Sequence, residues 1–385
     1  MDEDDERTAW LTLLRTPGLG AKGLRVLLQR AGDVRGALEQ ARRDGVPGAG
    51  ARARDWLRAP DHERLQHDAA WLAQPGHRLL RCTEADFPPQ LERMDDPPAA
   101  LYVAGNAGML LQPQLAIVGA RNASPGGRRN AAAFARALAL RGLAITSGLA
   151  EGIDAAAHEA TLKASGATVA VVGTGPDRVY PRRHAELAAA VAEQGVLVSE
   201  FAPGTQARPG HFPRRNRIIA GLSLGTLVVE AGLRSGSLIT ARLAAECGRE
   251  VFALPGSIHH PLARGCHRLI RDGACLVETV DDILQVLTPL AQAQGADLRA
   301  RLQEDAAGAC RDGADAARPP RRAPDSGPAD PGRDRILEAL GYDPATLDEL
   351  CERCGLAAAA LSPALLMLEL DGAVASLPGG RYQRL

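Results

Sequence analysis

A cluster of basic residues follows an aromatic side chain past the middle of the sequence. With this aromatic residue included, we define the basic cluster as Phe212, Arg214, Arg215, Asn216 and Arg217. It opens a segment that is predicted to be a helix, and the N-terminus of a helix carries positive potential. Because guanidinium groups bind phosphate in a fork geometry, this pattern favours a site that tracks phosphate groups. A charged, solvated helix face is the plain alternative.

Glycine-rich turns with polar side chains occur at several other places, each directly after an apolar run. The residues of these turns that could meet an anion are Gly119, Arg121, Ser124, Ser147, Gly148, Gly173, Arg182, Glu230, Ser235, Gly236, Ser237 and Thr240. Glycine lets backbone N–H groups approach an anion, and a helix that begins at such a turn adds its own donors. One turn alone could be an ordinary connection, but several in series favour an anion-binding crevice.

Nucleotide-dependent chemistry is not indicated. Gly18, Gly20 and Gly23 match a dinucleotide-binding spacing, but the segment before them is helical in pattern, and the turn at Gly173 lacks the third glycine. No motif of an ATP-hydrolysing P-loop occurs. Glu230 could be catalytic, ribose-binding or structural, and without a second carboxylate at a recognisable spacing we favour a structural role. We expect no catalytic residue and no cofactor.

The turns must be positioned by a sheet. Short apolar runs alternate with alanine-rich helical segments, which is typical of a parallel sheet covered on both faces. We predict strands at 115–118, 144–147, 168–172, 195–199, 226–230, 250–253 and 274–277. The fold class is therefore α/β, with a doubly wound parallel sheet. Ligands of such sheets bind at the carboxyl ends of the strands, which is where the turns fall.

Four segments are predicted. Residues 1–73 form a small all-α domain with two similar turns, at 16–20 and 46–50, which suggest a helix-hairpin-helix or SAM-like fold. Residues 74–290 contain the sheet. Residues 291–332 mix polar residues, proline and glycine without apolar periodicity and are expected to be a flexible linker. Residues 333–385 show three helical segments, at 335–340, 346–354 and 362–370, and a turn at 379–380 between two short strands, as in a winged helix.

The composition places limits on the function. The net charge of −1 means that a nucleic-acid site must be a local patch, and only 3% of the residues are aromatic, too few for a usual base-stacking platform. The acidic N-terminus and the lack of a long apolar run predict a cytoplasmic protein with no membrane segment. The seven cysteines are scattered, and Cys351 and Cys354 have no partner pair, so we expect reduced thiols and no metal site.

In their order along the chain, several motifs resemble the DprA/Smf family over residues 80–290. They are Val118-Gly-Ala-Arg121, Ser147-Gly-Leu-Ala-Glu-Gly-Ile-Asp154, Phe212-Pro-Arg-Arg-Asn-Arg217, Val229-Glu-Ala-Gly232 with Ser235-Gly-Ser237, and Leu254-Pro-Gly256 with Gly265-Cys266. The C-terminal segment resembles the winged helix of many members. Its third helical segment carries Glu369 and no basic residue, so we expect it to contact protein or to serve as an accessory, rather than to read the major groove.

The resemblance implies an extended Rossmann fold that binds single-stranded DNA in a basic pocket and forms a homodimer through this domain. It also implies a role in natural transformation and competence, in which the protein shields incoming DNA and loads RecA. The family's pocket arginine falls on Arg121, and its Phe-x-x-Arg-Asn segment falls on 212–216. We therefore predict a DNA-binding mediator that is not an enzyme, whose DNA-binding residues are those of the basic cluster and of the glycine-rich turns named above.

A hydrolase is the alternative. The run from Gly225 to Glu230 approximates the end of the motif of nucleotide phosphoribohydrolases of the lysine-decarboxylase-like (LOG) type, with one extra residue. The glycines and proline expected before that motif are replaced by 220–224, which weakens the phosphate loop. An NAD-linked oxidoreductase is disfavoured by the missing glycine fingerprint.

Overall fold

The computed structural model describes residues 3–312, 339–340, 345–354, 361, 365, 368, 374–377 and 381–384. The chain divides into two compact units, Met1–Arg311 and Asp312–Leu385, which are considered separately. None of the described helices combines the length and the apolarity that crossing a bilayer requires.

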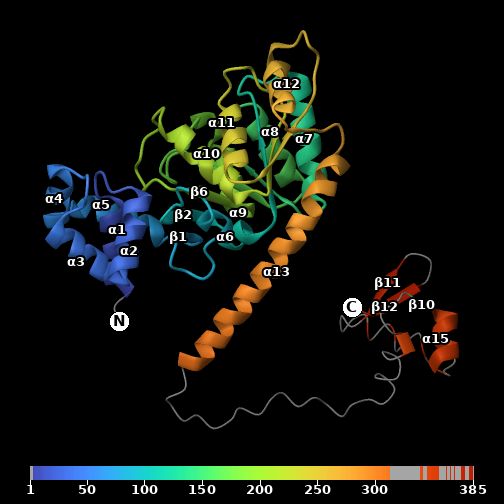
Figure 1. Ribbon diagram of the computed structural model, residues 1–385, viewed down its shortest axis with the longest axis horizontal. Coiled ribbons are helices and arrows are strands. Elements are labelled where there is room, and N and C mark those ends of the chain that lie inside the picture. Colours follow the sequence, from blue (N-terminus) through green and yellow to red (C-terminus); the bar gives the residue numbers. More distant parts are fainter. Residues whose placement is uncertain are drawn as a thin grey trace. The chain divides into compact units, whose positions relative to one another are not determined.

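The first unit begins with five short helices, drawn in blue in Figure 1. They are α1 (Glu3–Leu14), α2 (Ala21–Ala31), α3 (Val34–Asp44), α4 (Ala51–Arg58) and α5 (His62–Leu72). The two predicted glycine turns precede α2 and α4 and lie against each other, since a Cβ added at Gly18 would be 3.2 Å from the Cβ of Ala49. Trp10 and Trp71 are buried in a core that continues to Tyr102 of the sheet. The helices are therefore packed onto the sheet through an apolar interface.

A nine-stranded sheet follows, in the order β1-β2-β6-β5-β4-β3-β7-β8-β9. Its parallel strands are β3 (Gln114–Val118), β4 (Ala144–Ser147), β5 (Thr168–Val172), β6 (Val196–Ser199), β7 (Gly225–Val228), β8 (Glu250–Ala253) and β9 (Cys275–Leu276). The predicted parallel, doubly wound sheet is confirmed. Two further strands, β1 (His77–Arg81) and β2 (Ala100–Gly105), extend it in antiparallel fashion and were not predicted.

Helices cover both faces of the sheet. One face packs against α7 (Pro125–Ala139), α8 (Ile153–Lys163), α9 (Ala185–Gln194) and the first turns of α13 (Val280–Asp312). The other packs against α6 (Pro89–Glu92), α10 (His211–Leu222), α11 (Ser237–Glu246) and α12 (Arg264–Arg271). The first parallel strand, β3, lies between β4 and β7, so the chain winds outward from it in both directions. This topological switch point is where doubly wound folds bind ligands.

Helix α13 corrects the predicted linker. It runs to Asp312, so residues 291–312 of that segment are helical. The segment is rich in Ala, Gln and Arg, which have high helix propensity, but its weak apolar periodicity does not indicate a helix in the sequence. The remainder of the predicted linker, 313–332, lies outside the described residues.

In the second unit, the described residues contain β10 (Ala345–Thr346), α15 (Leu347–Cys354), β11 (Val374–Leu377) and β12 (Arg381–Arg384). The strands form one sheet in the order β10-β12-β11, with β11 and β12 antiparallel. Leu350, Leu365 and Leu368 are buried in a common core, which fits the predicted second and third helices. The predicted turn at 379–380 lies outside the described residues.

Candidate nucleic-acid interface

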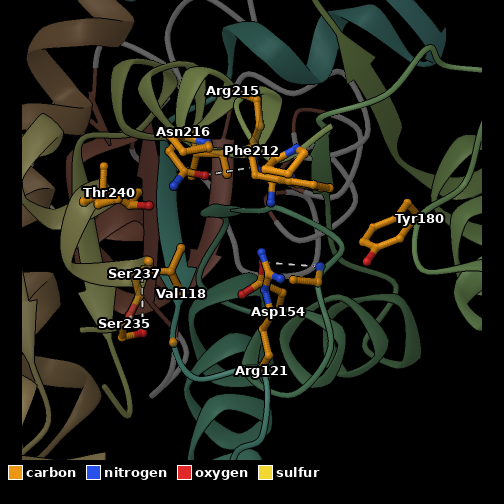
Figure 2. A pocket seen from close by; sticks show the side chains of 17 residues that line it. Val118, Arg121, Asp154, Tyr180, Phe212, Arg215, Asn216, Ser235, Ser237 and Thr240 are labelled. Carbon is orange, nitrogen blue, oxygen red and sulfur yellow. Dashed lines mark hydrogen bonds between the residues drawn. The ribbon is translucent and has the colours of Figure 1, made fainter. Parts of the chain in front are cut away.

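A cleft of about 540 Å³ lies at the switch point of the sheet. Its lining includes Val118 and Arg121 from the end of β3 and the loop after it, Asp154 from the first turn of α8, and residues from the first turns of α10 and α11. Figure 2 shows Phe212, Arg215 and Asn216 across the cleft from Arg121 and Asp154, with Ser237 and Thr240 at one end and Tyr180 at the other. Loops that are far apart in the sequence thus meet at one edge, as predicted.

Arg121 is the accessible cation of the cleft. Its side chain is exposed and has no carboxylate partner among the residues that the structure describes. The guanidinium carbon lies 5.5 Å from the centre of the Phe212 ring, a cation–π distance. The guanidinium therefore keeps its hydrogen-bond donors free for a phosphate group.

Arg215 forms a second, buried cation behind Arg121. Its Nη1 donates hydrogen bonds to the carbonyl of Gly148 at 2.6 Å and to that of Val171, and its Nε donates to Oδ1 of Asn216 at 2.9 Å. Burial lowers the pKa of Arg215 to about 10, with the Asp154 carboxylate acting in the opposite direction, so the guanidinium stays protonated at neutral pH. A Cβ at Gly148 would overlap this guanidinium, which explains why glycine stands there.

Asp154 organises the turn after β4. Its Oδ2 accepts the N–H of Gly148 at 3.1 Å and that of Ala150 at 3.4 Å. Burial raises the pKa of the Asp154 carboxyl, while the charge of Arg215 acts to lower it. Leu149, between the two donors, has a φ of 57° in the left-handed region, which is costly for a leucine. The Gly148 N–H that we expected to meet a phosphate is thus occupied by Asp154.

Glu230 joins the loops on the two sides of the switch point. Its carboxylate accepts the N–H of Ser124 at 2.9 Å and the hydroxyl of Ser124 at 2.5 Å. The Ser124 oxygen in turn accepts the N–H of Gly127 at 2.9 Å and caps α7. Neither Ser124 nor Glu230 lines the cleft. These contacts to Ser124 fit the structural role favoured for Glu230.

The structure divides the basic cluster. Arg217 is buried and pairs with Glu200, while its Nη1 donates to the carbonyl of Asp96 at 2.5 Å. Arg214 is exposed, and its Nε lies 3.0 Å from the other Glu200 oxygen. Neither lines the cleft, whereas Arg215 and Asn216 do. Of these three arginines, which we expected to converge on one phosphate-binding edge, only Arg215 lines the cleft.

The remaining predicted residues occupy different places. The predicted residues that line the cleft besides those above are Gly119, Phe212, Ser235, Gly236, Ser237 and Thr240. Gly148 lines a smaller hollow beside it, with Arg121. Ser147 is buried and donates to the carbonyl of Ile117, and Gly173 makes room for Phe212, whose Cδ1 would lie 3.1 Å from an added Cβ. Arg182 is exposed on the loop beyond β5 and does not line the cleft.

One aromatic and one charged side chain of the cleft, Tyr180 and Asp154, were not among the predicted site residues. Tyr180 is half exposed, and its ring lies 5.4 Å from that of Phe212, so two aromatic rings flank the cleft. Asp154 was recognised only as part of a motif. The signals that could have found them are an aromatic residue in a loop after a strand, and an acidic residue in the first turn of a helix beside a glycine turn.

Comparisons with known proteins agree with this arrangement. Family models match at residues 78–288 (DNA recombination-mediator protein A), 318–380 (DprA winged helix domain) and 4–63 (DprA-like N-terminal HHH domain). Protein Smf of Escherichia coli K12 is 43% identical over 326 residues, which cover 83% of this chain and 81% of that protein. DNA processing protein DprA of Streptococcus pneumoniae R6 is 46% identical over 198 residues, 51% of this chain and 70% of that protein.

Solved structures support the same relationship. The X-ray structure of DprA from Streptococcus pneumoniae aligns with a TM-score of 0.65 at 35% identity, covering 72% of this chain and 97% of that chain. A structure that addresses the single-stranded DNA binding mode of DprA from Helicobacter pylori aligns with a TM-score of 0.51 at 28% identity, covering 55% and 96%. With the matches along the whole chain, these findings show that the chain belongs to the DprA/Smf family of DNA recombination mediators.

Proposed function

We propose that this chain binds single-stranded DNA in the cleft at the switch point and passes the strand to a RecA-type recombinase. The observation that carries the proposal is the exposed, unpaired guanidinium of Arg121, stacked on Phe212 in front of the buried charge of Arg215. Membership of a family of recombination mediators, and the single-stranded DNA binding studied in the Helicobacter pylori relative, support it.

The cleft offers distinct partners to the parts of a nucleotide. A phosphate fits between Arg121 and the N-terminus of α11, where Ser235, Gly236 and Ser237 line the wall and the helix dipole favours an anion. The exposed ring of Tyr180 offers an apolar face on which a base can stack, whatever its identity. Such binding depends little on sequence, because phosphate contacts and stacking carry no base code.

Replacing Arg121 by alanine tests the proposal directly. Each phosphate contact on single-stranded DNA contributes about 0.7 to the slope of log affinity against log salt concentration, so the slope of Arg121→Ala should fall by about that amount. The measurement is fluorescence anisotropy of a labelled oligonucleotide at several salt concentrations. Arg136→Ala, an exposed arginine further along α7, is the matched control and should keep the wild-type slope. An unchanged slope for Arg121→Ala would remove Arg121 from the site.

The same pair of variants tests the transfer of the strand. The wild-type chain should speed the assembly of RecA on single-stranded DNA that is coated with single-strand-binding protein. The ATPase activity of RecA measures this assembly. Arg121→Ala should lose this acceleration and Arg136→Ala should keep it. If Arg121→Ala binds DNA poorly but still accelerates RecA, the cleft does not deliver the strand.

We further propose that the chain forms a homodimer through the sheet domain. Leu233, Ile239 and Leu276 are partly exposed near the edge of the sheet that ends in β9, and the first two line a groove of about 810 Å³. Burying this apolar edge against a second copy would remove it from water. Light scattering of the wild-type chain should give twice the chain mass of 40.4 kDa. The Leu233→Glu variant should give the mass of a single chain. A monomeric wild-type chain would contradict the proposal.

We propose no enzymatic activity. The motif of the LOG-type hydrolases would assign Glu230 to catalysis, but its carboxylate is engaged by Ser124 and lies outside the cleft lining. The carboxylate that does line the cleft, Asp154, accepts two backbone N–H groups. An assay for adenine released from AMP separates the two functions, and release at catalytic rates would contradict this proposal.

A further inference from the structure

The loop between β6 and α10 connects the N-terminal helices to the cleft. It runs from Glu200 to Gly210, and its last part includes Pro209, which lines the cleft just before Phe212. Near its middle, the carbonyl of Pro203 accepts a hydrogen bond of 2.8 Å from Nη2 of Arg15, which follows α1. A residue of the helical segment thus holds a loop that leads directly into the cleft.

Arg15 is itself held in one orientation. Its Nε and Nη2 lie 2.5 Å from the two carboxylate oxygens of Asp68 on α5, whose side chain is completely buried. Burial raises the pKa of the Asp68 carboxyl, and the hydrogen bonds and charge of Arg15 act against that rise. Buried ion pairs contribute little net stability, but their two-pronged geometry fixes direction. Asp68 therefore aims the Arg15 guanidinium at Pro203.

The sheet domain holds the same part of the loop from the other side. The N–H of Gly204 donates to Oδ1 of Asp177 at 2.7 Å, and the N–H of Gly175 donates to the carbonyl of Thr205 at 2.9 Å. Beyond this point, residues 206–210 are mostly exposed, and their position depends on the two ends of the loop. The Pro203–Thr205 segment is thus an anchor to which both parts of the unit contribute.

We propose that Arg15, oriented by Asp68, is a positioning residue through which the N-terminal helices set the affinity of the cleft for single-stranded DNA. The guanidinium holds Pro203 so that Pro209 and the start of α10, with Phe212, are placed for the strand before it binds. Arg15 touches no DNA in this arrangement. The inference rests on the proposed function of the cleft.

The chain offers a matched control. Arg25 on α2 also reaches from the helical segment to the sheet domain, where its Nε and Nη2 donate to the carbonyl of Pro98 at 3.1 Å and 3.0 Å. Its guanidinium also lies 5.5 Å from the Phe87 ring. Pro98 precedes β2 and does not line the cleft. Arg25→Ala therefore weakens the same docking without disturbing the loop at 203–210.

The experiment compares Arg15→Ala, Arg25→Ala and the wild-type chain in oligonucleotide binding at several salt concentrations. Arg15→Ala should bind about tenfold more weakly, the order expected when a charge-assisted hydrogen bond no longer preorganises the site. Its salt slope should equal that of the wild type, because no phosphate contact is lost. Arg25→Ala should keep both affinity and slope. A reduced slope for Arg15→Ala, or equal losses in both variants, would overturn the proposal.

Hydrogen exchange of the free proteins separates this inference from the proposed function. Amides of 203–212 should exchange faster in Arg15→Ala and at the wild-type rate in Arg25→Ala, even if the wild-type chain binds no DNA. Unchanged exchange in Arg15→Ala would overturn the anchoring role. If Arg15→Ala does not fold, Arg15→Lys keeps a charge opposite Asp68 but lacks the fork that reaches Pro203 as well, and the same outcomes apply to it.

Discussion

Replacing Arg215 by methionine is expected to abolish most of the binding of single-stranded DNA and to destabilise the fold. The change removes the buried cation behind the cleft and leaves the carboxyl of Asp154 buried without its opposite charge. The carbonyls of Gly148 and Val171 also lose their donor. Each buried acceptor that is left without a donor costs about 1–3 kcal/mol of the free energy of unfolding. Denaturant unfolding and oligonucleotide binding measure the two effects.

The neighbouring Arg214 provides the control for this experiment. It is exposed and shares the Glu200 carboxylate with Arg217 outside the cleft lining, so that buried carboxylate keeps a cationic partner when Arg214 is replaced. Arg214→Met should therefore keep nearly wild-type unfolding and DNA binding. If the two variants lose affinity equally, the strand is bound by the exposed face of α10 and not by the cleft.

Replacing Gly152 by alanine is expected to lower the free energy of unfolding by about 3 kcal/mol or more. Gly152 has a φ of 81°, which favours glycine, and an added Cβ would overlap the backbone carbonyl oxygens of Ala120 and Arg121. Backbone atoms cannot move aside as a flexible side chain can, so the loop carrying Arg121 must shift. Thermal or denaturant unfolding measures the loss, and DNA binding should fall with it.

Gly126→Ala is the matched control for Gly152→Ala. Gly126 lies in the first turn of α7, where an added Cβ would be 3.6 Å from Oγ of Ser124, an ordinary contact. Alanine also favours the helical conformation, so this variant should be at least as stable as the wild type. Equal destabilisation by both substitutions would contradict this explanation. The loss of stability would then come from adding any side chain in this region, and not from the close approach of Gly152 to the loop after β3.

The parallel part of the sheet could be predicted because its strands are apolar runs buried on both faces. All the residues of β3 and β5 are buried, and such runs are distinctive in sequence. The strand β1 was missed because it is an edge strand with Arg78 and Arg81 in its five residues, which a search for apolar runs passes over. The strand β2 is apolar, but its antiparallel pairing to β6 depends on contacts that are distant in sequence.

The candidate site could be predicted at the level of loops but not of individual arginines. Parallel strands bring their carboxyl ends to one edge, so Arg121 and Ser235 had to approach each other. Neighbouring positions on a helix point in different directions, however, and residues two apart do not share a face. Arg215 therefore turns to the cleft while Arg217 turns to Glu200. Glu200, which pairs with Arg217 away from the cleft, lies 17 residues earlier in the chain, so no local sequence pattern indicates this contact.

The bridge from Glu230 to Ser124 bears on which molecule changes conformation when the protein and the DNA strand associate. Because one carboxylate joins the loops after β3 and β7, and Asp154 fixes the turn after β4, the walls of the cleft have little conformational freedom left to lose. The entropic cost of ordering then falls mainly on the polynucleotide, whose unpaired backbone is flexible enough to follow a rigid surface, whereas a stiff duplex is not.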